Sequence, residues 1–224
     1  TKSDYQSGRA FSDFPLSATL LEGLHGLGYT EATQVQAATI EPGLAGRDLL
    51  VRAKTGTGKT CAFCVPMIEN VEEGTRKVQG IVLAPTRELA NQIAEECAGI
   101  ARYKDIRILP VYGGVSMGPQ IQALEEGVEI VIGTPGRVLD HIRRGNLDLS
   151  TIRSFCLDEA DEMLSMGFYE DVAKILDSAP KESQTLLFSA TVEAQVKRLV
   201  LKFLNDPVDI MLSTDTDKVE GITN

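Results

Sequence analysis

The amino-acid sequence predicts an α/β protein with an open parallel sheet and helices on both faces of that sheet. Short apolar runs recur along the chain, and each is followed by small or polar residues and then by a helical pattern. Such uniformly apolar runs are typical of strands buried on both faces, as in parallel sheets. Alternating strands and helices indicate the α/β class. A (β/α) barrel shares this alternation, and the phosphate-binding motif described below favours the open sheet.

The expected strands each lead directly into a polar motif. They lie at 49–51, 81–83, 108–111, 130–132, 155–157 and 186–188. The segments between them, such as 88–102 and 192–204, are long enough for crossover helices. Because ligands bind beyond the carboxyl ends of the strands in open sheets, we expect all of these motifs to share one edge.

The segment before the first expected strand is predicted to be a helical flank of the same domain. Pro15 and the turn at 26–28 punctuate it. The expected organisation is a leader without regular structure at 1–10, one domain at 11–212 with the flank at 11–45, and a linker at 213–224.

Composition argues against several other classes of protein. The 224 residues are 43% apolar and 24% charged, so a core can form without disulfides or metals. No apolar run approaches the ~20 residues that span a bilayer, and no membrane partner is expected. With no signal peptide near Thr1 and only four cysteines, we expect no disulfide framework and a cytoplasmic location. Cys61 and Cys64 form a C-x-x-C pair that is expected to pack in the core. His25 and His141 are expected on helix surfaces.

A glycine-rich stretch after the first expected strand resembles a Walker A loop. It consists of Ala53, Lys54, Thr55, Gly56, Thr57, Gly58, Lys59 and Thr60. Gly56 and Gly58 can turn backbone N–H groups toward phosphate oxygens, and the following helix adds its positive end. Lys59 supplies a charge for the β- and γ-phosphates, and the Thr60 hydroxyl is a ligand for Mg²⁺. Ala53 departs from the general pattern, which begins with glycine.

Acidic residues follow the expected strand at 155–157. Asp158 can hold the magnesium shell, and Glu159 beside it can polarise an attacking water. An acidic cluster alone is usually a solvated loop. In one chain with the phosphate-binding loop, it predicts an ATP-hydrolysing site.

Together with other motifs, these residues resemble the first RecA-like domain of DEAD-box RNA helicases. The resemblance runs from about Phe11 to about Met211, and the stretch at 158–168 is most similar to bacterial members. The matching motifs are Gly28 to Gln36, Ala53 to Thr60, Pro85 to Leu89, Gly113-Gly114, Thr134 to Arg137, Asp158 to Asp161, and Ser189-Ala190-Thr191. The resemblance implies a RecA-like fold, ATP and Mg²⁺ as cofactors, RNA as a partner, and a second RecA-like domain in the full-length protein.

The resemblance also implies roles for individual residues at the nucleotide. Gln36 would read adenine with Thr33 beside it, and Phe11 would stack on the base. Ala32 and Gln34 stand where the family commonly has proline. The catalytic residues would be Lys59, Asp158 and Glu159, with Glu159 as the base. The Mg²⁺ ligands would be Thr60 and Asp158, partly through water. The residues that couple nucleotide state to domain closure would be Asp161, Ser189, Ala190 and Thr191.

RNA contact is implied despite an acidic chain. The formal net charge is -10 and the pI is about 4.8, which argues mildly against a nucleic-acid partner. Hydroxyls, backbone N–H groups and a few placed arginines suffice for phosphate contacts, however, so no basic surface is required. By resemblance, the residues that line the RNA backbone would be Thr86, Arg87, Gly114, Thr134, Gly136 and Arg137.

Two other functional classes are weighed against this interpretation. A GTPase or small-molecule kinase would share the phosphate-binding loop, but the Asn-Lys-x-Asp guanine reader is not found in the sequence. An RNA- or partner-binding module without catalysis is disfavoured because Lys59, Asp158 and Glu159 are intact. The family's second domain supplies an arginine finger worth roughly 10³–10⁵ in rate. We therefore expect slow ATP hydrolysis, and no unwinding, from this domain alone.

Overall fold

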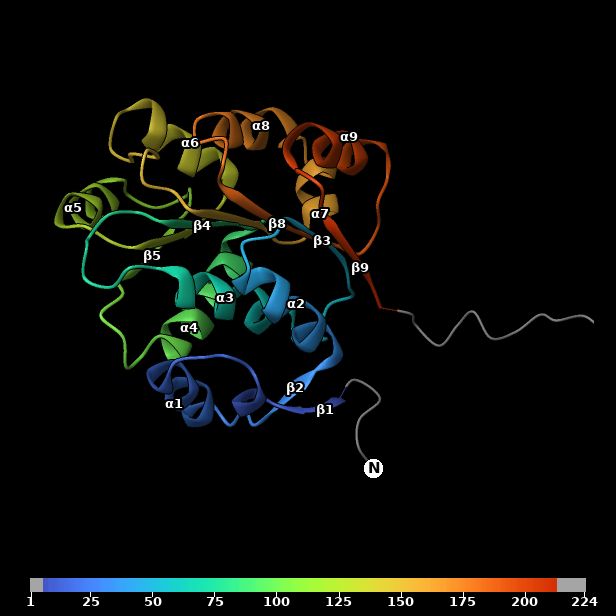
Figure 1. Cartoon of the computed structure of the whole chain (residues 1–224). Helices are drawn as coiled ribbons and strands as arrows, with labels where there is room; N and C mark the ends of the chain where they lie inside the picture. The colour runs from blue at the N-terminus through green and yellow to red at the C-terminus, as the bar shows by residue number, and fades with distance from the viewer. Residues whose placement is uncertain (1–5, 213–224) are drawn as a thin grey trace, which may run out of the picture.

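Seven parallel strands form the central sheet of the computed structural model, which describes residues 6–212 (Figure 1). Their spatial order is β5-β6-β4-β7-β8-β3-β9. The bounds are β3 (Leu49–Arg52), β4 (Gly80–Leu83), β5 (Ile108–Val111), β6 (Ile130–Gly133), β7 (Ser154–Leu157), β8 (Gln184–Ser189) and β9 (Val208–Met211). The predicted open parallel sheet is therefore confirmed, and the barrel is excluded because β5 and β9 are edges.

Burial explains why the strands were recognisable in the sequence. Every residue of β4, β6, β7 and β8 is buried, which requires the apolar runs seen there. Strand β9 was not predicted. Only Ile210 in it is buried, and Asp209 interrupts its apolar pattern, as is usual for an exposed edge strand.

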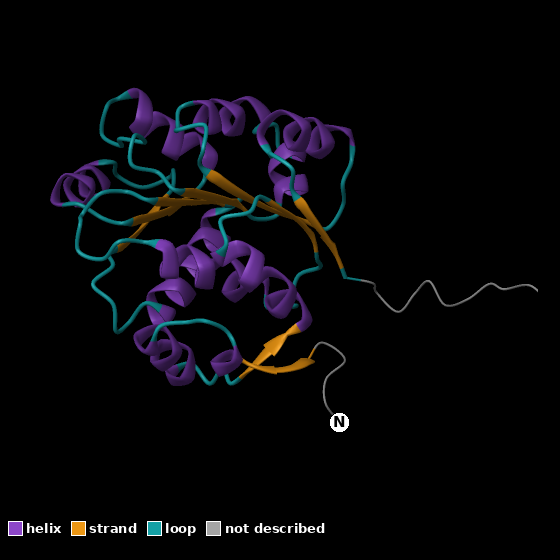
Figure 2. Cartoon of the chain, in the orientation of Figure 1, coloured by secondary structure: helices purple, strands orange, loops and turns teal. Residues whose placement is uncertain are grey.

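Helices cover both faces of the sheet, as predicted (Figures 1 and 2). One face carries α1 (Ala18–Gly26), α2 (Gln34–Leu44), α3 (Lys59–Asn70) and α4 (Arg87–Ile100). The other carries α5 (Gly118–Glu126), α6 (Pro135–Arg143), α7 (Ala160–Ser165), α8 (Tyr169–Asp177) and α9 (Ala194–Phe203). The strands serve both layers: Leu49 and Val51 belong to the core beneath α1–α4, whereas Leu50 belongs to the core beneath α5–α9.

The N-terminal flank contains a small sheet that the sequence did not predict. Strand β1 (Gln6–Ala10) pairs antiparallel with β2 (Glu31–Thr33), and a 3-10 turn (Phe11–Asp13) follows it. The expectation of a leader without regular structure was therefore wrong for residues 6–10. Residues 6–10 form a strand because they pair with β2, which lies far away in sequence. The Ser7 hydroxyl donates to the Ala32 carbonyl at 2.6 Å. The expected linker at 213–224 lies outside the described residues.

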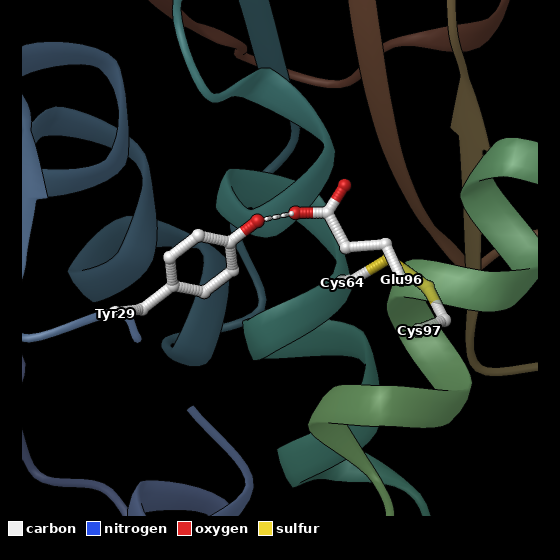
Figure 3. Close-up of a disulfide and its surroundings, with 4 residues drawn as sticks. All are labelled: Tyr29, Cys64, Glu96 and Cys97. Carbon is white, nitrogen blue, oxygen red and sulfur yellow. Dashed lines mark hydrogen bonds between the residues drawn. A yellow bond between two sulfur atoms is a disulfide. The ribbon is translucent and has the colours of Figure 1, made fainter. Parts of the chain in front are cut away.

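A disulfide joins α3 to α4, although no disulfide was expected (Figure 3). Cys61 and Cys64 both pack in the core, as predicted. Cys64 and Cys97 are 33 residues apart and meet because the two helices pack side by side on one face. Cys61 is free and buried, as expected for a core residue, and so is Cys156. Among the described residues, no helix is long and apolar enough to cross a membrane.

Candidate nucleotide and RNA site

The motifs follow the carboxyl ends of six parallel strands. The glycine-rich loop follows β3, Thr86 follows β4, Gly113 follows β5, Thr134 follows β6, Asp158 follows β7, and Ala190 follows β8. Parallel strands point their carboxyl ends to the same edge, where α/β proteins bind ligands. The structure therefore places these six predicted segments at one edge of the sheet.

Two glycines shape the loop between β3 and α3. Gly56 and Gly58 have φ of 80° and 81°, in the left-handed region that side chains disfavour. At Gly58 a Cβ atom would also lie 2.5 Å from Gln36 Nε2. Gly58 is the N-cap residue of α3 and provides no side-chain cap, and a helix start of this kind can receive an anion. Lys54 and Thr55 are exposed at the tip, and Thr57 closes the loop through a 2.7 Å bond to the Lys54 carbonyl.

Lys59 bridges the two carboxylates that follow β7. Its Nζ lies 3.1 Å from Asp158 Oδ1 and 3.4 Å from Glu159 Oε1. Burial lowers the pKa of Lys59, but the negative charges of Asp158 and Glu159 outweigh this effect and raise it above its usual value. Burial raises the pKa of Asp158, although Lys59 opposes that shift. The structure thus brings the three predicted catalytic residues together.

The Asp158 carboxylate retains an oxygen without a partner. Oδ1 accepts a hydrogen bond from the Glu159 backbone N–H at 3.0 Å, whereas Oδ2 is buried and has no hydrogen-bond partner among the described residues. Asp158 contacts Lys59, which precedes Thr60 in the first turn of α3, so its orphaned oxygen fits a hard cation such as Mg²⁺. No group of three or more His, Cys, Asp or Glu side chains in the described part could hold a metal. Mg²⁺ is normally held by one or two protein ligands together with phosphates and waters, so the residues fit that ion.

Glu159 has an unusual backbone conformation. Its φ of 50° and ψ of 51° lie in the left-handed region. Glu159 is the N-cap residue of α7. Such angles are costly for a residue with a Cβ atom, and they are found repeatedly at active sites.

A cavity of about 350 Å³ opens beside these side chains. Its walls are Ala53, Thr55, Lys59, Glu159, Asp161, Glu162, Ser165, Ala190, Thr191 and Glu193. Sequence reasoning missed Glu162, Ser165 and Glu193. Glu162 could have been found from its spacing, because it lies three residues after Glu159, one turn along the chain. A hydrogen bond to Glu159 raises the pKa of Glu162.

The predicted coupling residues join the loop after β8 to helix α7. Thr191 donates to Asp161 Oδ2 through its backbone N–H at 3.2 Å and its hydroxyl at 3.0 Å. The Ser189 hydroxyl donates to the Thr191 carbonyl, and Ala190 lines the cavity. The loop after β8 is therefore bound directly to α7, which begins next to Glu159.

Gln36 and Thr33 contact the phosphate-binding loop. Gln36 Nε2 donates to the Gly58 carbonyl at 3.0 Å, and its Oε1 accepts from the Thr33 N–H at 2.8 Å. The Thr33 hydroxyl donates to the Thr57 carbonyl at 2.9 Å. Each polar atom of the Gln36 amide keeps one further hydrogen-bonding position, and the residue is 4% exposed. Phe11 is 2% exposed and packs against neighbouring aromatic rings, so little of its ring is available for stacking.

The predicted RNA-contact residues lie along the same edge, from β4 to β5. Thr86 caps α4 by accepting from the Leu89 N–H, and the exposed Arg87 lies over the Tyr112 ring at 4.8 Å. Gly114 has a φ of 80°, and a Cβ atom at Gly136 would meet nothing within 4 Å. Thr134 is half-buried and begins α6 without a side-chain cap.

Arg137 is held by protein groups at this edge. Both of its terminal nitrogens lie 3.1 Å from the Val115 carbonyl, and Nη1 is also 3.2 Å from Gln120 Oε1. The expectation for His141 was wrong, since it is completely buried rather than on a helix surface. Its partner is Gln120 Oε1 at 2.8 Å, which a local pattern could not show. His25 is exposed, as predicted.

Comparisons with known proteins agree with this geometry. Residues 33–199 match the DEAD/DEAH box helicase family. The chain is 47% identical over 212 residues to the DEAD-box ATP-dependent RNA helicase CshA of Bacillus licheniformis, covering 95% of this chain and 44% of that protein. Against CshA of Bacillus cereus the identity is 48%, with 89% and 38% covered. The chain thus spans less than half the length of these relatives.

Solved structures show the same fold. A DEAD box protein from the hyperthermophile Methanococcus jannaschii superposes with a TM-score of 0.87 at 42% identity, covering 90% of this chain and 55% of that one. A Saccharomyces cerevisiae Dbp5 variant, bound to Gle1 and IP6, gives a TM-score of 0.84 at 30% identity, covering 92% and 52%. The predicted RecA-like DEAD-box fold is confirmed, and the chain belongs to the DEAD/DEAH box helicase family.

Proposed function

We propose that the chain is the ATP-binding and ATP-hydrolysing domain of a DEAD-box RNA helicase that works in the cytoplasm. It would couple Mg-ATP binding and hydrolysis to RNA binding and local duplex unwinding, together with a second RecA-like domain. The observation that carries the proposal is the contact of Lys59 with Asp158 and Glu159 beside the 350 Å³ cavity. The relatives named above are helicases of this kind by name.

The geometry supports separate roles for the site residues in ATP hydrolysis. The N–H groups of the loop and of the first turn of α3 would hold the phosphates of ATP, and Lys59 would pair with the β- and γ-phosphates. Thr60 and the free Oδ2 of Asp158 would hold Mg²⁺, which neutralises charge on the transferred phosphoryl group when bound. Glu159 takes the proton of the attacking water as the base. Asp161 and Thr191 transmit the nucleotide state to the loop after β8.

The RNA would be contacted through its backbone and without sequence preference. The segments at Thr86, Gly114 and Thr134 offer hydroxyls and N–H groups, while Arg87 and Arg137 add charge. Neutralising about two phosphates of a single strand implies a slope near -1.4 in a log–log plot of affinity against salt.

Nucleotide binding by the chain tests the first half of the proposal. Titration calorimetry with Mg²⁺ is expected to show binding of ADP and much weaker binding of GDP. Glu159→Gln should keep ADP binding, because the residue acts on water, but should abolish the residual ATPase activity. Equal affinities for ADP and GDP would contradict the assignment of adenine recognition to Gln36. An undiminished ATPase in Glu159→Gln would contradict the assignment of the base.

A further inference from the structure

A buried amide on α5 links segments that are expected to contact RNA. Gln120 is 7% exposed, and its Nε2 donates to the Tyr112 carbonyl, at the end of β5, at 3.0 Å. Its Oε1 accepts from the Arg137 guanidinium at 3.2 Å and lies 2.8 Å from His141 Nε2. One side chain therefore connects the loop that contains Gly114 with the first turns of α6.

The hydrogen bonds determine the tautomer of His141. Since Gln120 uses Nε2 to donate to a carbonyl, its Oε1 is an acceptor, and His141 Nε2 must carry a proton. The other ring nitrogen, Nδ1, lies 3.2 Å from Asn146 Nδ2, which donates to it. A neutral imidazole satisfies both bonds. Burial and the nearby charge of Arg137 lower the pKa of His141 and keep it neutral.

Tyr112 extends the connection to α4. Its carbonyl accepts from Gln120, and its ring lies 4.8 Å beneath the Arg87 guanidinium. The Arg137 guanidinium is meanwhile held against the Val115 carbonyl at 3.1 Å. The segments after β4, β5 and β6 are thus joined through Tyr112 and Gln120, on a part of the edge that does not line the 350 Å³ cavity.

We propose that Gln120, braced by His141, is a positioning residue for RNA binding. It holds the Arg137 guanidinium and the loop at Gly114 in one arrangement, so that the phosphates of a single strand meet a preformed surface. Preorganisation of this kind improves affinity because little side-chain freedom is lost on binding. The proposal rests on the RNA-binding function proposed above.

The test compares two buried variants with one exposed control. Gln120→Leu removes the bridging amide, and His141→Leu removes its brace from a different helix. Gln122→Leu is the control, because Gln122 lies on the same helix and is exposed. Fluorescence anisotropy of a labelled single-stranded RNA is measured across a salt series. ADP affinity of each variant reports the integrity of the nucleotide site.

We expect Gln120→Leu to weaken RNA binding about tenfold, which corresponds to one charge-assisted hydrogen bond. The salt slope should fall by about 0.7, the contribution of one phosphate on a single strand. His141→Leu should shift both quantities in the same direction, whereas Gln122→Leu should change neither. Loss of stability alone would not alter the slope below the unfolding temperature.

The outcomes separate this proposal from the one on which it rests. If the unmodified chain does not bind RNA, the proposed RNA-binding function fails and this inference fails with it. If the unmodified chain binds and both buried variants retain its affinity and slope, only the positioning role is overturned. If both variants lose ADP binding as well, the network maintains the fold rather than the RNA surface, and the proposal is wrong.

Discussion

Reduction of the Cys64–Cys97 disulfide should substantially destabilise the fold. The bond closes a loop of 33 residues, from α3 to α4, and it limits the freedom of the unfolded chain. In the chain-entropy treatment, a loop of that length contributes about 3.7 kcal/mol at 25 °C. With a urea m-value of about 3 kcal/mol/M, as expected for a large domain, the unfolding midpoint should fall by about 1.2 M.

Equilibrium unfolding in urea, followed by circular dichroism with and without a phosphine reductant, measures this loss. The double variant Cys64→Ala/Cys97→Ala is the control, since its midpoint should not respond to the reductant. A thiol titration under denaturing conditions should find two thiols before reduction and four after it, because Cys61 and Cys156 are free. Four thiols before reduction, or an unchanged midpoint after complete reduction, would contradict the stabilising role of the Cys64–Cys97 disulfide.

Other predictions concern single side chains. Lys59→Ala should weaken the binding of ADP and ATP by about 1.5–3 kcal/mol, the range for hydrogen bonds to charged groups. In the same calorimetric titrations, AMP binding should barely change. An equal loss of AMP binding would indicate a misfolded loop. Gln36→Ala should weaken the free energy of ADP binding by about 1–3 kcal/mol, the range for a bidentate base contact. An unaltered ADP affinity would rule out a role of Gln36 in recognising adenine. Burial and the charge of Arg137 hold the pKa of His141 in the folded chain below its usual 6.5. The stabilisation from this neutral histidine is therefore present above about pH 6.5 and is lost as the pH falls from there through the lower folded pKa. The drop in melting temperature between pH 7.5 and 5.5 should be smaller in His141→Gln. Arg137→Ala should weaken all single-stranded RNAs alike in anisotropy measurements, and a sequence-dependent loss would argue for base contacts instead.

The central sheet and the segments at its edge could be predicted because their signals are local. Strands such as β6 and β7 are buried throughout, so each leaves a continuous apolar run in the sequence. The loops that follow them carry glycines, hydroxyls and carboxylates, which are the residue types that phosphate and magnesium sites use. Parallel topology then places these loops together without any knowledge of tertiary contacts.

What could not be predicted depends on partners far away in sequence. Strand β1 forms because β2 lies beside it, and β9 is an edge strand with one buried residue. The Cys64–Cys97 bond and the burial of His141 arise from packing between neighbouring helices, to which no short pattern is sensitive. Phe11 was predicted by resemblance to stack on adenine, but its burial depends on the packed flank.

The left-handed backbone conformation of Glu159 lowers the stability of the fold at the residue that is proposed as the catalytic base. A non-glycine residue at a φ of 50° costs about 1–2 kcal/mol relative to glycine, which adopts the same angles freely. Glu159→Gly would relieve that cost and eliminate the carboxylate. A directed-evolution screen that selects this domain for heat resistance alone would therefore favour substitutions that inactivate it, unless turnover is selected at the same time.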